Sequence, residues 1–74
     1  MSELVTVDVN QNGVADVRLN RPDKYNALSP DMFDAITEAG ESLIDDSSIR
    51  AVVLSGNGRG FCAGLDFSSF QSMA

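Results

Sequence analysis

The stretch IRAVVLSGNGRG, residues 49–60, decides the fold class of this 74-residue chain. Its first part contains four consecutive apolar residues, 51–54, with no polar alternation. Such a run is typical of a parallel strand that is covered on both faces, because a strand with one wet face alternates. The glycines at positions 56, 58 and 60 then indicate a flexible turn. We therefore predict an α/β fold around a buried parallel strand.

Two alternating segments lie near the N-terminus and predict an antiparallel hairpin over residues 4–20. The dipeptide Asn12-Gly13 separates them and is a strong hairpin signal, because both residues tolerate positive φ. The apolar side chains at every second position are Val5, Val7, Val9, Ala15, Val17 and Leu19.

A helix is predicted between the hairpin and the parallel strand. Ser29 is a suitable N-cap, Pro30 suits the first helical position, and Asp31 places an acid in the first turn. We expect the helix to end near Leu43 or Ile44. Its predicted apolar face consists of Phe33, Ile36, Gly40, Leu43 and Ile44. A second helix is predicted over residues 67–73, giving the order β-β-α-β-(α).

Composition excludes several functional classes. Five basic and eleven acidic residues give a net charge of −6, which argues against nucleic-acid and anionic-membrane surfaces. The chain has no histidine and one cysteine, Cys62, so it cannot by itself form an internal disulfide or a Ser-His or Cys-His pair. No secretory signal or membrane span is visible, so we expect a cytoplasmic location. With 74 residues, the core is small and stability should be marginal.

The glycines at 56, 58 and 60 raise the possibility of a nucleotide site. A dinucleotide fingerprint needs its third glycine one position later, where Phe61 stands, and the chain has no Gly-Lys-Ser/Thr for a P-loop. A turn without a nucleotide is therefore the favoured interpretation.

The junction of residues 63–66 has two interpretations. If a helix begins at Leu65, its unpaired backbone N–H groups suit a developing oxyanion, and Gly64 allows a substrate to approach the backbone. The alternative is a simple left-handed turn capped by Asp66, which the local pattern alone favours. Cys62, between Phe61 and Ala63, is interpreted as a small buried core thiol. The carboxylates Asp16, Glu38, Glu41, Asp45 and Asp46 are interpreted as solvated surface groups.

Two segments, NRPDKYNAL at residues 20–28 and GFCAGLD at residues 60–66, together resemble the start of the enoyl-CoA hydratase/isomerase (crotonase) superfamily. The helix and the Val-Val-Leu strand between them lie where that family has them. The resemblance extends from Leu4 onward and implies the first ββα units of the crotonase-like (ClpP/crotonase) spiral fold. Members of the family are several times longer, so we expect residues 1–74 to be the N-terminal part of a single, truncated domain.

The resemblance also implies a site. By position, the backbone amide of Leu65 is one of two N–H donors in an oxyanion hole that holds a thioester oxygen. The loop of residues 23–27 resembles the coenzyme A contact loop, where backbone groups around Tyr25 and Ala27 line the path and Lys24 adds a charge near phosphate. The implied substrate contacts are Asp23, Lys24, Tyr25, Ala27, Ala63, Gly64, Leu65 and Asp66. Neither a metal nor a separate cofactor is implied, because coenzyme A is part of the substrate.

The implied function is acyl-CoA thioester binding with stabilisation of an enolate, most often for hydration of a trans-2-enoyl-CoA in fatty acid metabolism. Enoyl-CoA or dienoyl-CoA isomerisation is the alternative within the family, with hydrolase, dehalogenase and ring-forming variants beyond it. The second oxyanion donor and the catalytic carboxylates of the family lie downstream of residue 74, so we expect the isolated chain to be inactive. The resemblance implies a homotrimer or a dimer of trimers for the parent protein. A non-catalytic binding or association module is the alternative from a different class.

Overall fold

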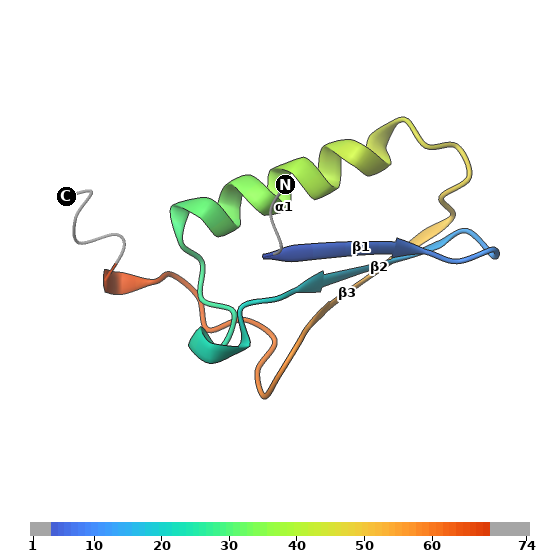
Figure 1. The fold of residues 1–74 in the computed structure, drawn as a ribbon. Helices are drawn as coiled ribbons and strands as arrows, with labels where there is room; N and C mark the ends of the chain where they lie inside the picture. The colour runs from blue at the N-terminus through green and yellow to red at the C-terminus, as the bar shows by residue number, and fades with distance from the viewer. Residues whose placement is uncertain (1–3, 69–74) are drawn as a thin grey trace.

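The computed structural model describes residues 4–68, which form a three-stranded sheet with an α-helix over one face (Figure 1). The elements are β1 (Val5–Val9), β2 (Val14–Leu19), the short 3-10 helix η1 (Pro22–Lys24), α1 (Pro30–Ile44) and β3 (Ala51–Gly56). The sheet order is β1-β2-β3. The α/β class predicted from the sequence is therefore confirmed. In this part of the chain, no helix has both the length and the apolarity that a membrane crossing requires.

β1 and β2 form the predicted antiparallel hairpin. Asn10 closes the turn, since its Oδ1 accepts hydrogen bonds from the backbone N–H groups of Asn12 at 2.8 Å and Val14 at 3.1 Å. Gly13 has a φ of +81°, and its carbonyl accepts a hydrogen bond of 2.7 Å from the backbone of Arg50. The hairpin turn therefore also fixes the start of β3.

The ends of α1 lie where the sequence predicts them. Ser29 is the N-cap, and its Oγ accepts a hydrogen bond of 3.2 Å from the backbone N–H of Met32. Pro30 occupies the first helical position, where its missing N–H has no intrahelical partner to lose. The helix ends at Ile44, with Asp45 as the C-cap.

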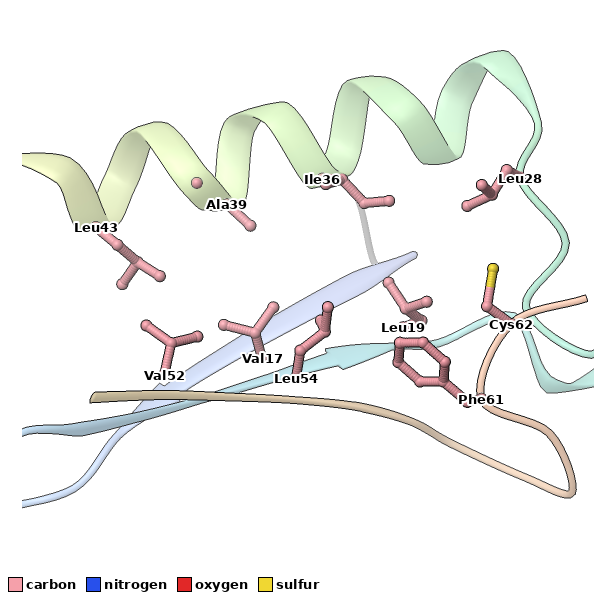
Figure 2. A pocket seen from close by; sticks show the side chains of 11 residues that line it. Val17, Leu19, Leu28, Ile36, Ala39, Leu43, Val52, Leu54, Phe61 and Cys62 are labelled. Atoms are coloured by element: carbon pink, nitrogen blue, oxygen red, sulfur yellow. The ribbon is translucent and has the colours of Figure 1, made fainter. Parts of the chain in front are cut away.

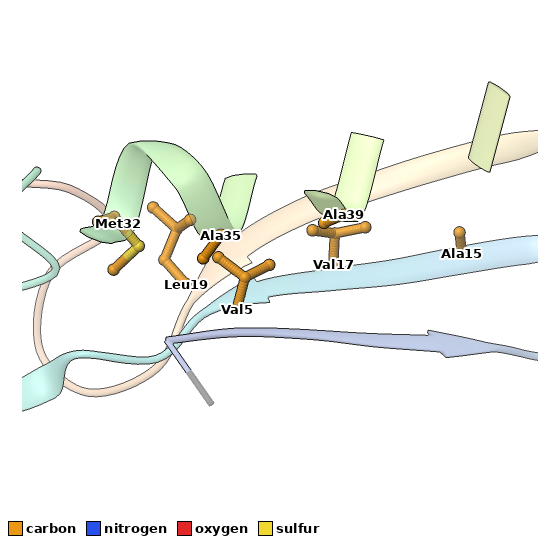
Figure 3. Close-up of a cluster of buried hydrophobic side chains, with 7 residues drawn as sticks. All are labelled: Val5, Ala15, Val17, Leu19, Met32, Ala35 and Ala39. Atoms are coloured by element: carbon orange, nitrogen blue, oxygen red, sulfur yellow. The ribbon is translucent and has the colours of Figure 1, made fainter. Parts of the chain in front are cut away.

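The buried face of α1 differs from the predicted one. The core consists of Val5, Ala15, Val17, Leu19, Met32, Ala35 and Ala39 (Figure 3). Of the predicted face, Ile44 is 76% exposed, Phe33 and Ile36 are 41% and 37% exposed, Gly40 is exposed, and only Leu43 is partly buried against the core. The physical reason is size, because two alanines allow the helix backbone to approach the sheet closely and a phenylalanine would hold it away.

β3 is parallel to β2, as predicted, with Val14 opposite Ala51 and Leu19 opposite Gly56. The prediction that both of its faces are covered is wrong within residues 4–68. The side chains of residues 52–54 are each 52–53% exposed. β3 is one of the two edge strands of the sheet, and α1 packs chiefly over β1 and β2 (Figure 1). The faces of β3 are partly exposed, and no other element within residues 4–68 covers its outer edge. An exposed apolar strand of this kind is a site for association.

We therefore expect the isolated 74-residue chain to self-associate or to be unstable. Val53→Lys places a charge on the exposed edge strand and should reduce association, because charged residues block edge-to-edge pairing. Sedimentation velocity over a range of concentrations measures the effect. Phe67, Phe70 and Met73 of the predicted second helix should add to this association, because they would lack apolar partners. Phe67 is 77% exposed, whereas Phe70 and Met73 lie outside the described residues.

Gln11→Lys is the matched control, since it adds the same charge at an exposed position of the hairpin turn, outside β3 and its exposed apolar side chains. It should leave association unchanged. An ideal monomer of the parent sequence with a cooperative thermal transition above about 60 °C would contradict this expectation.

Candidate functional site

The two segments that carry the resemblance, residues 20–28 and 60–66, lie side by side in the structure. A parallel bridge pairs Leu28 with Leu65. The backbone N–H of Leu28 donates to the carbonyl of Gly64 at 2.7 Å, and the N–H of Asp66 donates to the carbonyl of Leu28 at 3.0 Å. A further hydrogen bond of 3.0 Å runs from the N–H of Ala63 to the carbonyl of Tyr25. The candidate site is the surface formed by these two paired segments.

The backbone amide of Leu65 points away from this pairing. In a trans peptide unit, the carbonyl and the following N–H point in opposite directions. Because the carbonyl of Gly64 accepts from Leu28 and the peptide bonds of residues 4–68 are trans, the N–H of Leu65 is directed to the other side. Within residues 4–68, no hydrogen bond joins this N–H to another residue. Its amide can therefore donate to an external acceptor.

Gly64 supplies the backbone conformation that this orientation requires. Its φ of +89° lies in the left-handed region, which favours glycine. A β-carbon built at Gly64 would have no heavy atom within 4 Å, so the space beside this residue is open. A ligand can therefore approach the backbone here.

The turn also has the features of the alternative interpretation, in which Asp66 is a cap. Asp66 Oδ1 accepts hydrogen bonds from the N–H of Ser68 at 3.1 Å and from its Oγ at 2.7 Å. Helical conformation begins at Phe67, so the expectation that a helix begins at Leu65 is wrong. The direction of the Leu65 amide thus comes from pairing with Leu28 and not from a helix N-terminus.

The predicted coenzyme A loop is held mainly by its own backbone. Asp23 and Lys24 are exposed in η1, and Tyr25 is half-exposed with a φ of +51°. The N–H of Tyr25 donates to Pro22, and the N–H of Ala27 donates to Lys24. These two N–H groups are therefore used within the loop. The loop presents outward the side chains of Asp23, Lys24 and Tyr25.

Asn26 is a buried residue that the sequence interpretation did not single out. Its side chain is 0% exposed and its φ is +58°. Oδ1 accepts from the N–H of Arg21 at 2.7 Å, while Nδ2 donates to the carbonyls of Asn57 at 3.0 Å and Gly60 at 2.9 Å. The turn after β3, predicted to be flexible, is thus tied to this loop. The available signal was an asparagine, which tolerates the left-handed region, within a loop.

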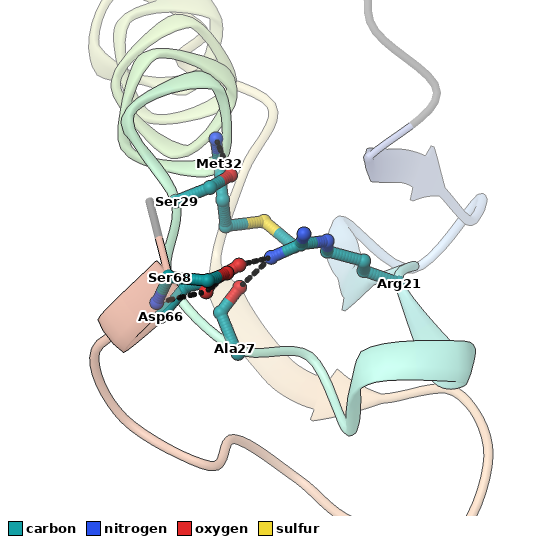
Figure 4. Close-up of polar contacts among 6 residues, drawn as sticks. All are labelled: Arg21, Ala27, Ser29, Met32, Asp66 and Ser68. Atoms are coloured by element: carbon teal, nitrogen blue, oxygen red, sulfur yellow. Dashed lines mark hydrogen bonds and ion pairs between the residues drawn. The ribbon is translucent and has the colours of Figure 1, made fainter. Parts of the chain in front are cut away.

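Arg21 and Asp66 form an ion pair between the two segments (Figure 4). Arg21 Nη1 lies 2.8 Å from Asp66 Oδ2 and also donates to the carbonyl of Ala27 at 3.1 Å. The carboxylate of Asp66, predicted as a substrate contact, is therefore bonded to Arg21 and Ser68. Arg21, like Asn26, lies in the motif of residues 20–28 but was assigned no role from the sequence.

An apolar groove of about 310 Å³ lies between α1 and the β2–β3 side of the sheet (Figure 2). Its lining includes Ile36 and Leu43 from the helix and Val52 and Leu54 from β3. Cys62 lies at one end of the groove, partly buried and packed against the core, and is thus less buried than predicted. Among residues 4–68, no three potential metal ligands of the His, Cys, Asp or Glu type come together.

Cys62 is expected to be structural. Its groove is lined by apolar side chains and glycine, and no basic side chain there could stabilise a thiolate. Cys62→Ala in the complete protein should retain most of kcat and cost about 1 kcal/mol of stability. Mass spectrometry of protein quenched during turnover checks this, and an acyl adduct on Cys62 with a collapse of kcat in the alanine variant would contradict it.

The chain is similar to known proteins in sequence and in fold. The family model described as enoyl-CoA hydratase/isomerase matches residues 9–74. The crystal structure of an enoyl-CoA hydratase from Mycobacterium smegmatis superposes with a TM-score of 0.86 at 45% identity, over 90% of this chain and 26% of that one.

Two isomerases are also similar. The chain is 38% identical over 58 residues to 1,2-epoxyphenylacetyl-CoA isomerase of Escherichia coli, covering 78% of this chain and 22% of the relative. It is 37% identical over 70 residues to the mitochondrial Delta(3,5)-Delta(2,4)-dienoyl-CoA isomerase of Mus musculus. That match covers 95% of this chain and 21% of the relative.

The structure is a three-stranded α/β unit with two paired loop segments. It matches the N-terminal portion of crotonase-fold structures, so the protein is of the crotonase-fold class. The chain belongs to the enoyl-CoA hydratase/isomerase family. It spans about a quarter of the length of the curated relatives that it matches.

Proposed function

We propose that this chain supplies one half of an oxyanion site for an acyl-CoA thioester. The observation that carries the proposal is the backbone N–H of Leu65, directed away from the Leu28 pairing next to open space at Gly64. A thioester oxygen that approaches this amide gains a donor that needs no reorganisation when negative charge develops. The exposed side chains of Lys24 and Tyr25 are candidates for contacts with coenzyme A.

The proposed reaction of the complete protein is hydration of a trans-2-enoyl-CoA. The oxygen of water bonds to C3, the displaced π electrons pass to the thioester oxygen, and the water's proton goes to a base. A proton added at C2 then restores the carbonyl. The Leu65 amide stabilises the oxygen while it carries charge. Acid–base groups and a second donor come from outside this chain, by analogy with the family, and we propose trimeric association and a cytoplasmic location on the same basis.

Isomerisation of an enoyl-CoA or dienoyl-CoA is the second candidate, favoured by the similarity to two isomerases. It uses the same enolate, because a proton removed from one carbon is returned to another. The Leu65 amide has the same role in both reactions, so this site does not distinguish them.

The discriminating experiment assays the 74-residue chain and the complete protein with crotonyl-CoA and with a 3-enoyl-CoA. Hydration removes the conjugated double bond of the first substrate, and isomerisation creates one from the second, so ultraviolet absorbance follows both. We expect the complete protein to hydrate crotonyl-CoA and the 74-residue chain to be inactive. Binding of neither thioester by the complete protein would refute the proposal and favour a non-catalytic module.

A further inference from the structure

The ion pair between Arg21 and Asp66 joins residues that are 45 positions apart in the sequence. The Arg21 side chain is only 20% exposed and the Asp66 side chain 10%. Because the same Nη1 atom also donates to the carbonyl of Ala27, one guanidinium nitrogen ties the loop of residues 20–28 to the residue that follows Leu65. Figure 4 shows this arrangement.

Asp66 is held from several directions. Its Oδ2 is bonded to Arg21, its Oδ1 accepts from Ser68, and its backbone N–H donates to Leu28. The two peptide units that flank Leu65 are therefore positioned by the contacts of Gly64 and Asp66. Of the side chains at these two positions, only that of Asp66 can contribute, because Gly64 has none.

We propose that Arg21 and Asp66 are positioning residues that set the direction of the Leu65 amide toward the thioester oxygen. The inference rests on the proposed function, which assigns this amide its role. A buried ion pair is weak evidence for stability, since apolar residues of similar volume often replace such pairs without loss. The direction of the Leu65 N–H is a more demanding requirement than stability. A donor must lie about 2.7–3.1 Å from the oxygen that becomes charged. A displacement of about 1 Å in such a site can cost about 10²-fold in rate.

The test uses the double variant Arg21→Met/Asp66→Asn in the complete protein. Methionine retains the apolar stem of Arg21, and asparagine retains an N-cap oxygen for Ser68. No buried charge is left without a partner, so a large loss of stability is not expected. The matched control is Arg18→Met/Asp16→Asn, which removes an ion pair of 2.9 Å with side chains 51% and 36% exposed, on β2.

The readout is the infrared carbonyl stretch of bound butyryl-CoA carrying ¹³C at the thioester carbonyl. A hydrogen bond to this oxygen lowers the stretching frequency. The band of unbound butyryl-CoA is subtracted at the fraction given by a separately measured Kd, so that only bound ligand is compared. The parent and the control should show the lowered frequency. The double variant should bind butyryl-CoA with its band moved back toward that of the free thioester, and its kcat should fall about 10²-fold.

A double variant that binds butyryl-CoA with the parent's band would overturn the inference. An unshifted band in the parent itself would instead refute the proposed function, so the two failures are distinguishable. If the double variant does not fold, Asp66→Asn alone provides the test. It weakens the charge-assisted bond to Arg21 while retaining the cap. Its band should lie between those of the parent and the free thioester, and a band identical to the parent's would reject the positioning role.

Discussion

Replacing Leu65 by proline in the complete protein should lower kcat by about 10²–10³-fold, equivalent to about 2.7–4 kcal/mol. Proline removes the backbone N–H that we assign to the thioester oxygen. Within residues 4–68, that N–H makes no hydrogen bond, so its loss removes no pairing described there. The bonds of the bridge use Gly64, Asp66 and Leu28 and do not involve the altered group. Steady-state kinetics with crotonyl-CoA measure the effect.

Leu65→Ala is the control for the side chain. The Leu65 side chain is about half exposed, and alanine keeps the N–H, so this variant should retain much of its kcat. Circular dichroism and thermal unfolding show whether the proline ring has disturbed the turn. Near-normal turnover of a folded Leu65→Pro variant would show that the amide is assigned wrongly.

Replacing Asn26 by alanine should destabilise the complete protein by about 3 kcal/mol or more. The substitution leaves the N–H of Arg21 and the carbonyls of Asn57 and Gly60 without their partner. At these partly buried positions each lost hydrogen bond costs about 1 kcal/mol, the lower end of the range for a buried unsatisfied group. Alanine is also less suited than asparagine to the φ of +58°, because the asparagine side chain can hydrogen-bond locally in the left-handed region. Urea unfolding measures the change in free energy.

Two variants separate the causes. Asn26→Gly accepts the positive φ but still lacks the three hydrogen bonds, so it should remain strongly destabilised. Asn10→Ala removes an asparagine side chain that also bonds two backbone N–H groups, but in an exposed turn, and should cost only about 1 kcal/mol. If Asn26→Gly matched the parent in stability, the hydrogen bonds of Asn26 would not be what holds the two segments together.

Local features of the structure were predictable from the residues. The hairpin follows from alternation and an Asn-Gly turn. α1 begins at Pro30, after the Ser29 cap, and ends at Ile44, because caps act through adjacent backbone groups. The apolar run of residues 51–54 correctly indicated a parallel strand, although its faces are not both covered within residues 4–68. The turn and the helix caps depend on sequence neighbours only.

Features that depend on distant residues were not predictable in this way. The buried face of α1 is decided by how closely the helix approaches β2, and periodicity cannot distinguish Ala35 from Ile36 on that basis. Exposure of β3 depends on which other elements cover it. Local pattern alone also could not bring Leu28 beside Leu65, and favoured a simple turn at Gly64. The family resemblance provided the candidate site, whereas the contacts of Asn26 and the Arg21–Asp66 pair required the structure.

The central claim is that the Leu65 amide donates to a thioester oxygen, and a crystal structure of the complete protein with bound butyryl-CoA tests it most directly. Butyryl-CoA has the thioester but no double bond to hydrate, so the complex is stable enough to observe. The Leu65 nitrogen should lie about 2.7–3.2 Å from the thioester oxygen, within hydrogen-bond distance. A thioester oxygen bound by other donors, with the Leu65 nitrogen beyond about 3.5 Å, would contradict the account.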